Sequence, residues 1–285
     1  MFKVNLYIKC AASRAPDAFK EYWLNSHAEQ SRDLLQQLGV RQYLKCEVLP
    51  EHPLTMASQE AYQTGPLGYD FIDHWVFNDI DLLTEAANDK ALIGELESVW
   101  AQENDWVDLR RSHTSMTVDL AQFFPLDGNE VRATPESDYL KIYYPAHHYP
   151  HLTRAQAQLH WNACHGAESR QHIRYSRQKK YIQCHAIDST FVDWLREHRG
   201  YGDQPCFIGH AEGWINPGFE PETAGAEDAA EIVRMTMDDI DLFSDKTLGA
   251  VFMAQEHYIL DQTVVTRTDP SDPGSPMPAF FSAAD

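Results

Sequence analysis

The sequence predicts an α+β fold built from two ferredoxin-like repeats, each with the element order β-α-β-β-α-β. The first observation is an internal repeat: a shift of 138 residues places Trp23–His27 on Trp161–His165 and Tyr43–Cys46 on Tyr181–Cys184. The second is that each copy alternates apolar and polar residues at the expected strands and spaces apolar residues by three or four at the expected helices. Two copies of one small unit therefore account for most of the 285 residues.

In the first copy, residues 2–8 alternate in hydropathy and predict a strand. A helix follows, because Phe19, Trp23 and His27 recur at four-residue steps, which turns His27 toward the sheet. A loop rich in Pro, Gly and Ser separates the second and third strands. The remaining predicted elements are strands at residues 43–48, 71–77 and 114–118, and a helix opened by Asp79 that runs to about Gln102.

The second copy begins in the same way, with a strand at residues 140–144. Its first helix starts near Thr153 and Gln156, which have the spacing of a capping box. Its second strand is predicted at residues 181–186.

Beyond this point the two copies are expected to differ. A shift of 160 residues aligns Asn78–Leu82 with Asp238–Leu242, which implies 22 extra residues (160 − 138) in the second copy. We therefore predict a third strand at residues 232–237 and an insertion at residues 187–228, which acts as a lid or as surface decoration. The predicted domain limits are residues 1–124, a linker at 125–138, a second domain at 139–265 and a flexible tail at 266–285.

The composition limits the classes of function. The chain has 23 Lys and Arg against 43 Asp and Glu, a net charge of −20, which excludes a role in binding nucleic acid or an anionic membrane surface. No leader peptide or long apolar segment is recognisable, so we expect a cytoplasmic protein. Five cysteines without a C-x-x-C pair favour reduced thiols over disulfides or a zinc ribbon.

Polar side chains gather on one predicted face of the sheet. His74 and Arg234 alternate with apolar residues on the two predicted third strands, and Lys45 and Glu47 do so on the second strand. Buried unpaired ions are costly, so such a face either meets solvent or lines a pocket, and the flanking tyrosines favour the pocket.

The segments FKVNLYIKC, PDAFKEYWLNSHAEQ, RQYLKCEV and YDFIDHWVFNDIDLL resemble an EthD-type dimeric α/β-barrel domain. The second copy resembles one in LTRAQAQLHWNACHGAE, KKYIQCHAI and AAEIVRMTMDDIDLF. The resemblance implies two sheets packed face to face, here as an intrachain dimeric α/β barrel. It also implies a cofactor-independent isomerase, cyclase, dehydratase/decarboxylase or quinone-forming oxygenase that acts on small aromatic or polyketide-like molecules, and some relatives handle haem.

The resemblance implies a histidine on the second strand and an acid on the third. The second copy keeps His185 but has Arg234 in the acid position, which suits an anionic oxygen. The first copy has Glu47 and His74 with their positions exchanged, which predicts an acid–base pair. The candidate catalytic residues are His27, Glu47, His74, His165 and His185, and the candidate substrate-binding residues are Tyr7, Tyr43, Lys45, Tyr143, Tyr181 and Arg234.

We therefore expect a cofactor-free lyase, dehydratase or isomerase acting on a small, oxygenated, aromatic substrate. The alternatives are a non-catalytic ligand-binding or auxiliary subunit of an oxygenase pathway, and a haem-binding barrel that uses His27 or His165. A His-rich loop at residues 147–151 is interpreted as solvated, and no metal site is predicted. A homodimer of tandem barrels is the expected assembly.

Overall fold

The computed structural model describes residues 1–262, apart from 66–67, 87, 126–129, 173–176 and 219–225. Within these residues the chain forms a closed antiparallel barrel with the strand order β1-β3-β2-β8-β5-β7-β6-β4. The α+β class and the closure of a barrel within one chain are both confirmed. The strands are β1 (Phe2–Ile8), β2 (Gln42–Leu49), β3 (Phe71–Phe77), β4 (His113–Phe123), β5 (Leu140–His147), β6 (Gln178–Ile187), β7 (Phe207–Ile215) and β8 (Phe252–Asp261).

Two strand pairs join the halves of the chain. β2 pairs with β8, and β4 pairs with β6, so both edge strands of each half form hydrogen bonds with edge strands of the other half. A sheet edge exposes unpaired backbone groups, and closure removes every such edge.

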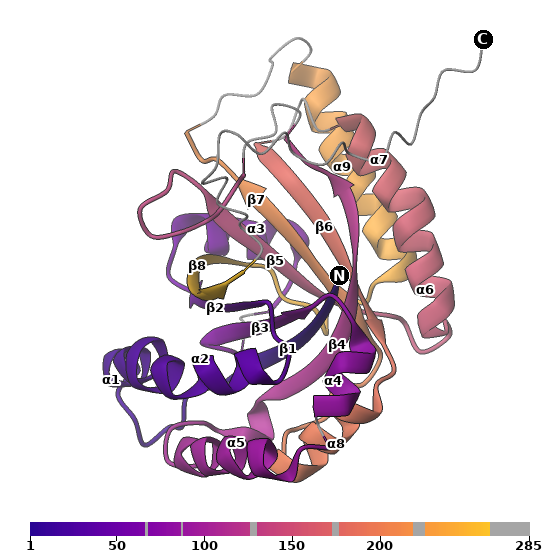
Figure 1. The fold of residues 1–285 in the computed structure, drawn as a ribbon. Helices are drawn as coiled ribbons and strands as arrows, with labels where there is room; N and C mark the ends of the chain where they lie inside the picture. Colours follow the sequence, from indigo (N-terminus) through magenta and orange to yellow (C-terminus); the bar gives the residue numbers. More distant parts are fainter. Residues whose placement is uncertain (66–67, 87, 126–129, 173–176, 219–225, 263–285) are drawn as a thin grey trace, which may run out of the picture.

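Helices surround the barrel (Figure 1). α1 to α5 belong to the first half in sequence and α6 to α9 to the second, but α8 packs beside α5, where the Trp100 and Trp194 rings are 6.0 Å apart. The helices are α1 (Pro16–Glu21), α2 (His27–Gln37), α3 (Pro53–Tyr62), α4 (Ile80–Ala86), α5 (Lys90–Glu103), α6 (Arg154–His160), α7 (Gly166–His172), α8 (Thr190–Arg199) and α9 (Ala226–Phe243), with a 3₁₀ turn η2 (Leu109–Arg111).

A π-helical turn interrupts the first helix of each half, at positions that the 138-residue shift matches to within one residue. These turns are η1 (Tyr22–Ser26) and η3 (Trp161–His165), and each sits between two α-helical segments. π-bulges within α-helices often occur at functional sites. Their matching positions agree with the 138-residue repeat.

The structure corrects the prediction for the second half. The predicted strand at residues 232–237 lies within α9, and the predicted insertion at 187–228 contains α8 and the barrel strand β7. The 138-residue shift in fact continues without interruption, because Phe71–Phe77 plus 138 falls on residues 209–215 of β7. The short match between Asn78–Leu82 and Asp238–Leu242 was misleading, since the first segment opens a helix and the second ends one.

Other boundaries also differ. The predicted loop after β2 contains α3. The described part of the predicted linker is partly buried, since Val131 and Ala133 are shielded from solvent. The Ala133 amide donates a hydrogen bond to the Glu256 carboxylate on β8 (2.8 Å). The predicted tail lies outside the described residues.

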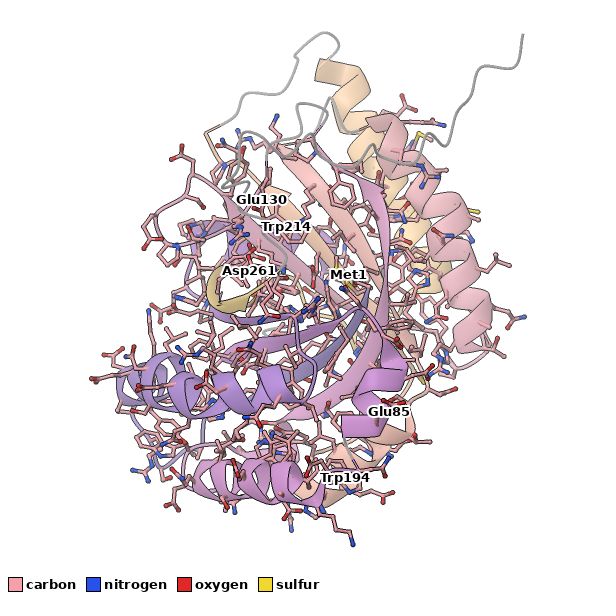
Figure 2. The ribbon with its side chains drawn as sticks, viewed as in Figure 1. Met1, Glu85, Glu130, Trp194, Trp214 and Asp261 are labelled. Carbon is pink, nitrogen blue, oxygen red and sulfur yellow. The ribbon has the colours of Figure 1, made fainter. Side chains whose placement is uncertain are left out.

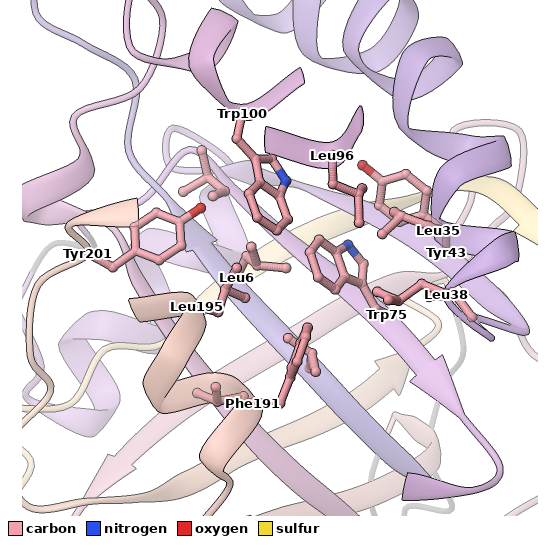
Figure 3. Close-up of a cluster of buried hydrophobic side chains, with 14 of the residues drawn as sticks. Leu6, Leu35, Leu38, Tyr43, Trp75, Leu96, Trp100, Phe191, Leu195 and Tyr201 are labelled. Atoms are coloured by element: carbon pink, nitrogen blue, oxygen red, sulfur yellow. The ribbon is translucent and has the colours of Figure 1, made fainter. Parts of the chain in front are cut away.

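The largest apolar core lies outside the barrel, between its wall and the helices (Figure 3). It combines Leu6 and Trp75 from the wall with Leu96 from α5 and Leu195 from α8. A second cluster, which includes Tyr7, Cys46, Ile72 and Phe252, fills part of the barrel interior. None of the described helices is long and apolar enough to span a membrane.

Candidate functional site

The predicted polar residues lie on two different faces of the barrel wall. In the β2–β3 register, Lys45 lies opposite Asp73, and Leu44 lies opposite His74. Opposed residues in a sheet share a face, so Lys45 and Glu47 point toward the helices while His74 points into the barrel. The prediction of a single polar face was therefore wrong.

The predicted Glu47–His74 pair is also wrong, for the same reason. Glu47 faces outward and is paired with Lys20 (2.5 Å) and with His257 (3.3 Å). The second predicted pair fails too, because Arg234 is on the exposed side of α9, where it binds Asp238 (2.7 Å). Its intended partner His185 is buried on β6, stacked on Trp161 with ring centroids 4.8 Å apart.

Inside the barrel, charged side chains form one continuous network. Lys3 contacts Asp119 (3.1 Å) and Glu212 (3.0 Å). Lys141 contacts Glu256 (3.0 Å) and the same oxygen of Glu212 (3.3 Å). All five side chains are at most 8% exposed.

The two halves contribute to this network at equivalent positions. Lys3 plus 138 is Lys141, and His74 plus 138 is Glu212. The last strand of each half matches in the same way. On β4, Asp119 lies two residues after Thr117, the residue opposite Lys3. On β8, Glu256 lies two residues after Ala254, the residue opposite Lys141. Each half therefore supplies one lysine–carboxylate pair, and the halves differ by having His74 in one and Glu212 in the other.

Two imidazoles complete the interior. His74 Nδ1 lies 2.7 Å from Asn5 Oδ1, and its Nε2 lies 2.6 Å from the Tyr143 hydroxyl. His210 Nδ1 lies 2.8 Å from the Tyr7 hydroxyl, and its Nε2 lies 3.0 Å from Glu212. Since Asn5 Oδ1 can only accept, His74 carries its hydrogen on Nδ1 and accepts from Tyr143 at Nε2.

The surroundings fix the charges of these groups. Burial lowers the pKa of His74 well below its ordinary value and also lowers that of His210, so both rings are neutral. Although burial opposes ionisation of Glu212, Lys141 and Lys3 hold its pKa well below the ordinary value. The interior therefore combines an ionised carboxylate, two ammonium groups with their own carboxylates, and a neutral imidazole with an accepting nitrogen.

A cavity of about 440 Å³ opens onto this network at one end of the barrel. Figure 2 shows this end, near Met1, Glu130 and Trp214. Its volume lies within the ~300–1,000 Å³ typical of small-molecule sites. The polar side chains that line its inner part are Lys3, His74, Asp119, Lys141, Glu212 and Glu256.

A second buried cluster lies in the first half, between the helices and the outer face of the barrel. His27 Nδ1 accepts a hydrogen bond from the Lys45 ammonium (2.9 Å), so its Nε2 donates to the Glu103 carboxylate (2.7 Å). The Lys45 ammonium also binds Asp73 (3.0 Å). Arg199 of α8 is paired with Glu103. Burial lowers the pKa of Lys45 to about 8, against the opposing effect of Asp73.

Asp73 is the centre of this cluster. It accepts hydrogen bonds from Trp23 Nε1 (3.0 Å) and from the hydroxyl of Tyr43 (3.1 Å). His27 thus faces the sheet as predicted, but its ring nitrogens are occupied by Glu103 and Lys45.

The equivalent region of the second half is less charged. His165 binds Asp239 of α9 (3.1 Å), and Tyr181 accepts a hydrogen bond from Trp161 Nε1 (3.2 Å). Burial lowers the pKa of His185 to about 4. A cavity of about 100 Å³ remains here, lined by Trp161, His165, Tyr181, Ala211 and Phe243 among others.

The sequence analysis missed His210, Glu212 and Glu256. His210 and Glu212 would have been found by carrying the 138-residue shift through the third strand, because the segment GHAEGWI alternates as FIDHWVF does. The 138-residue shift does not identify Glu256, because it places Asp119 on residue 257. The equivalence of Asp119 and Glu256 follows only from the strand register.

The EthD domain family matches residues 13–109, so this part of the chain is an EthD domain, and the resemblance of the first copy is confirmed. No curated protein matches the chain. Among solved structures, the chain is similar to a putative monooxygenase from Lactobacillus acidophilus NCFM (10% identity, 92% of this chain and 95% of that chain, TM-score 0.44). It is also similar to a dye-decolorizing peroxidase from Bacteroides thetaiotaomicron VPI-5482 (11% identity, 89% and 92%, TM-score 0.40).

Proposed function

We propose that this protein is an enzyme that moves protons on a small oxygenated molecule bound in the cavity at the end of the barrel. The observation that carries the proposal is that His74 and Glu212, both buried, line a cavity of 440 Å³ that is open to solvent. Perturbed titratable groups that converge on a cavity are typical of catalytic sites.

The chemistry follows from the protonation states. Glu212 is an ionised carboxylate and carries no proton, but Lys3 and Lys141 lower its basicity. It would accept a proton from carbon or oxygen once a substrate oxyanion takes its place beside these lysines. Lys3 and Lys141 remain cationic beside it, and ammonium groups in a buried site stabilise an enolate or alkoxide that forms as the proton leaves. His74, held in one tautomer by Asn5, is placed to relay a hydrogen through Tyr143.

The cavity favours a substrate that carries both polar groups and a flat ring. Charged side chains line it, and the rings of Trp214 and Tyr258 lie on its wall. A lyase, dehydratase or isomerase acting on an oxygenated aromatic compound fits this combination. Two tandem ferredoxin-like repeats and a cytoplasmic location remain part of the proposal.

Solvent deuterium exchange tests the proposal without knowledge of the natural reaction. Purified protein is incubated in D₂O with a panel of small phenols, β-diketones and hydroxy-acids, and mass spectrometry records deuterium at carbon. Glu212→Gln and His74→Ala are expected to lower the exchange rate by ~10²–10⁴. Glu47→Gln is the matched control, since Glu47 lies outside the barrel.

The alternatives predict different results. A non-catalytic ligand-binding subunit would bind members of the panel with no exchange above the buffer rate. Haem binding at His165 is disfavoured because the adjoining cavity is about 100 Å³, below the ~300 Å³ at the lower end of drug-sized sites. A Soret band with 1:1 stoichiometry after haem addition would reverse that judgement.

A further inference from the structure

Two imidazoles and one carboxylate meet inside the barrel. His210 Nε2 is 3.0 Å from Glu212 Oε1, and His74 Nε2 is 3.4 Å from the same oxygen. The three side chains offer ligand atoms that all lie within 4.8 Å of one another. We propose that His74, His210 and Glu212 form a binding site for a divalent first-row transition-metal cation. This inference rests on the proposed function, because it places the cation at the inner end of the same cavity.

The two separations that involve Glu212 Oε1 suit such a cation. The third, between the two imidazoles, is within 4.8 Å, whereas two metal–ligand bonds span at most about 4.2 Å, so the rings approach each other slightly on binding. With metal–ligand bonds of about 2.1 Å, atom separations of 3.0 and 3.4 Å correspond to angles of about 90° and 110° at the metal. These are the angles of octahedral and tetrahedral sites. Two histidines and one carboxylate with open positions are a common set for Fe²⁺ or Zn²⁺.

The far nitrogen of each ring is held by another side chain. His74 Nδ1 is fixed by Asn5 Oδ1, and His210 Nδ1 by the Tyr7 hydroxyl. Metal-binding histidines almost always have such a partner, because it fixes the ring and its tautomer. His210 Nε2 thereby faces Glu212 Oε1, and His74 Nε2, which now accepts from Tyr143, lies 3.4 Å from the same oxygen.

The hydrogens that now lie at His74 Nε2 and His210 Nε2 can be accepted by other groups when a cation binds. The Tyr143 hydroxyl donates toward His74 Nε2, and Cys46 Sγ lies 3.0 Å away as a second acceptor. His210 can transfer its hydrogen from Nε2 to Nδ1, where the Tyr7 oxygen accepts it. A cation can therefore replace these hydrogens while every group keeps a hydrogen-bond partner.

The buried charges also leave room for a cation. Lys3 is paired with Asp119 and Lys141 with Glu256, so Glu212 is the surplus carboxylate among the five. Both lysines contact Glu212 at Oε2, so Oε1 remains for the imidazoles. A divalent cation would change the net charge of these five side chains from −1 to +1, and a hydroxide or an anionic substrate oxygen at an open coordination position would bring it back to zero.

The cavity supplies an entrance and free coordination positions, since His74 and Glu212 both line it. A divalent cation there would act as a Lewis acid on a substrate oxygen. Polarisation of that oxygen would acidify a neighbouring carbon, and Glu212 keeps Oε2, the oxygen that does not face the imidazoles, to accept the proton. The site replaces the expectation of a metal-free protein.

Metal binding is measured directly on the full chain, purified without a histidine tag. The protein is stripped with a chelator, dialysed against Zn²⁺, Co²⁺, Mn²⁺ or anaerobic Fe²⁺, and analysed by mass spectrometry for metal. We expect about one equivalent per chain of at least one of these ions. X-ray absorption of the Zn²⁺ form is expected to show two imidazoles and no sulfur ligand.

Single variants assign the site. His210→Ala and Glu212→Gln are expected to weaken binding by at least about tenfold, whereas His257→Ala and His148→Ala are expected to leave it unchanged. Thermal unfolding checks that the variants fold, and added Zn²⁺ is expected to raise the Tm of the native protein but not of His210→Ala.

The outcomes separate this proposal from the proposed function. Less than about 0.1 equivalent of every ion in the native protein, or a sulfur ligand to zinc, would overturn the metal site whatever the deuterium exchange shows. Full binding in both His210→Ala and Glu212→Gln would do the same. Stoichiometric metal without any exchange would instead remove the proposed function and keep the site.

Discussion

The two halves fill the space between helices and barrel in opposite ways. In the first half this space holds the buried pair Lys45–Asp73 and the ring of Trp75. At the positions 138 residues later, the second half has Gln183, Ala211 and Gly213. These residues carry no charge, and two of them are small.

The smaller side chains of the second half leave unfilled space between its helices and the barrel. A cavity of about 100 Å³ remains in the second half, whereas Trp75 belongs to the largest core cluster of the protein. Arg199 of α8 also reaches across from the second half to pair with Glu103 of the first. The same fold therefore accepts either charged or uncharged side chains at these equivalent positions, provided that each buried charge has its partner.

The largest expected effect comes from removing the centre of the ionic filling. Asp73→Ala leaves Lys45 without its carboxylate and Trp23 and Tyr43 without their acceptor. We expect the free energy of unfolding to fall by about 3–5 kcal/mol in urea denaturation. Arg234→Ala, which removes an exposed ion pair on α9, is the control and should change it by less than about 1 kcal/mol.

The double variant Lys45→Gln/Asp73→Ala gives the first half the residues of the second. Because both charges of the pair are removed together, we expect it to be more stable than Asp73→Ala alone by about 2 kcal/mol. Denaturation of the two variants side by side measures this difference. If the double variant is as unstable as the single one, the loss is due to packing and the ionic comparison is wrong.

Gly213→Ala tests how closely the second half is packed around its cavity. A Cβ at Gly213 would lie 2.0 Å from the Gln178 side-chain amide and 2.7 Å from Ile142 Cγ2. We expect a loss of about 1–3 kcal/mol from overpacking. Gly94→Ala on α5, where a Cβ meets nothing within 4 Å, should be neutral or stabilising and serves as the control.

The smallest effect is a dependence on pH. The pKa of Lys45 is about 8 in the folded protein, below the ~10.4 of an unfolded lysine. Between these values the unfolded chain binds more protons, so the free energy of unfolding contributed by this group rises with pH. From pH 8 to pH 9 the increase is about 1 kcal/mol, and Lys45→Gln should lack it. Identical slopes for the two proteins over this interval would contradict the lowered pKa.

Periodicity and the repeat predicted much of the fold. The strand at residues 2–8, the helix that carries His27 and the strands around Tyr43 and Phe71 lie where the pattern places them. The prediction of the third strand of the second half was wrong, because the five-residue match of Asn78–Leu82 to Asp238–Leu242 departs from the continuous 138-residue repeat, which places this strand at β7. The pattern of residues 232–237 alone predicts a strand. The barrel is already closed by the strands β1 to β8, so it has no open edge for a further strand, and these residues form part of α9.

The sequence by itself determined that polar residues alternate along each strand, since alternation depends only on the two-residue period of the backbone. It could not determine which of them share a face, because that depends on the register between strands. A register that places Lys45 beside Asp73 and Leu44 beside His74 separated the predicted Glu47–His74 pair and brought His74 to His210 and Glu212, 136 and 138 residues away. Barrel closure decided the rest: only when β2 meets β8 and β4 meets β6 do the two halves combine their lysines and carboxylates in one buried network.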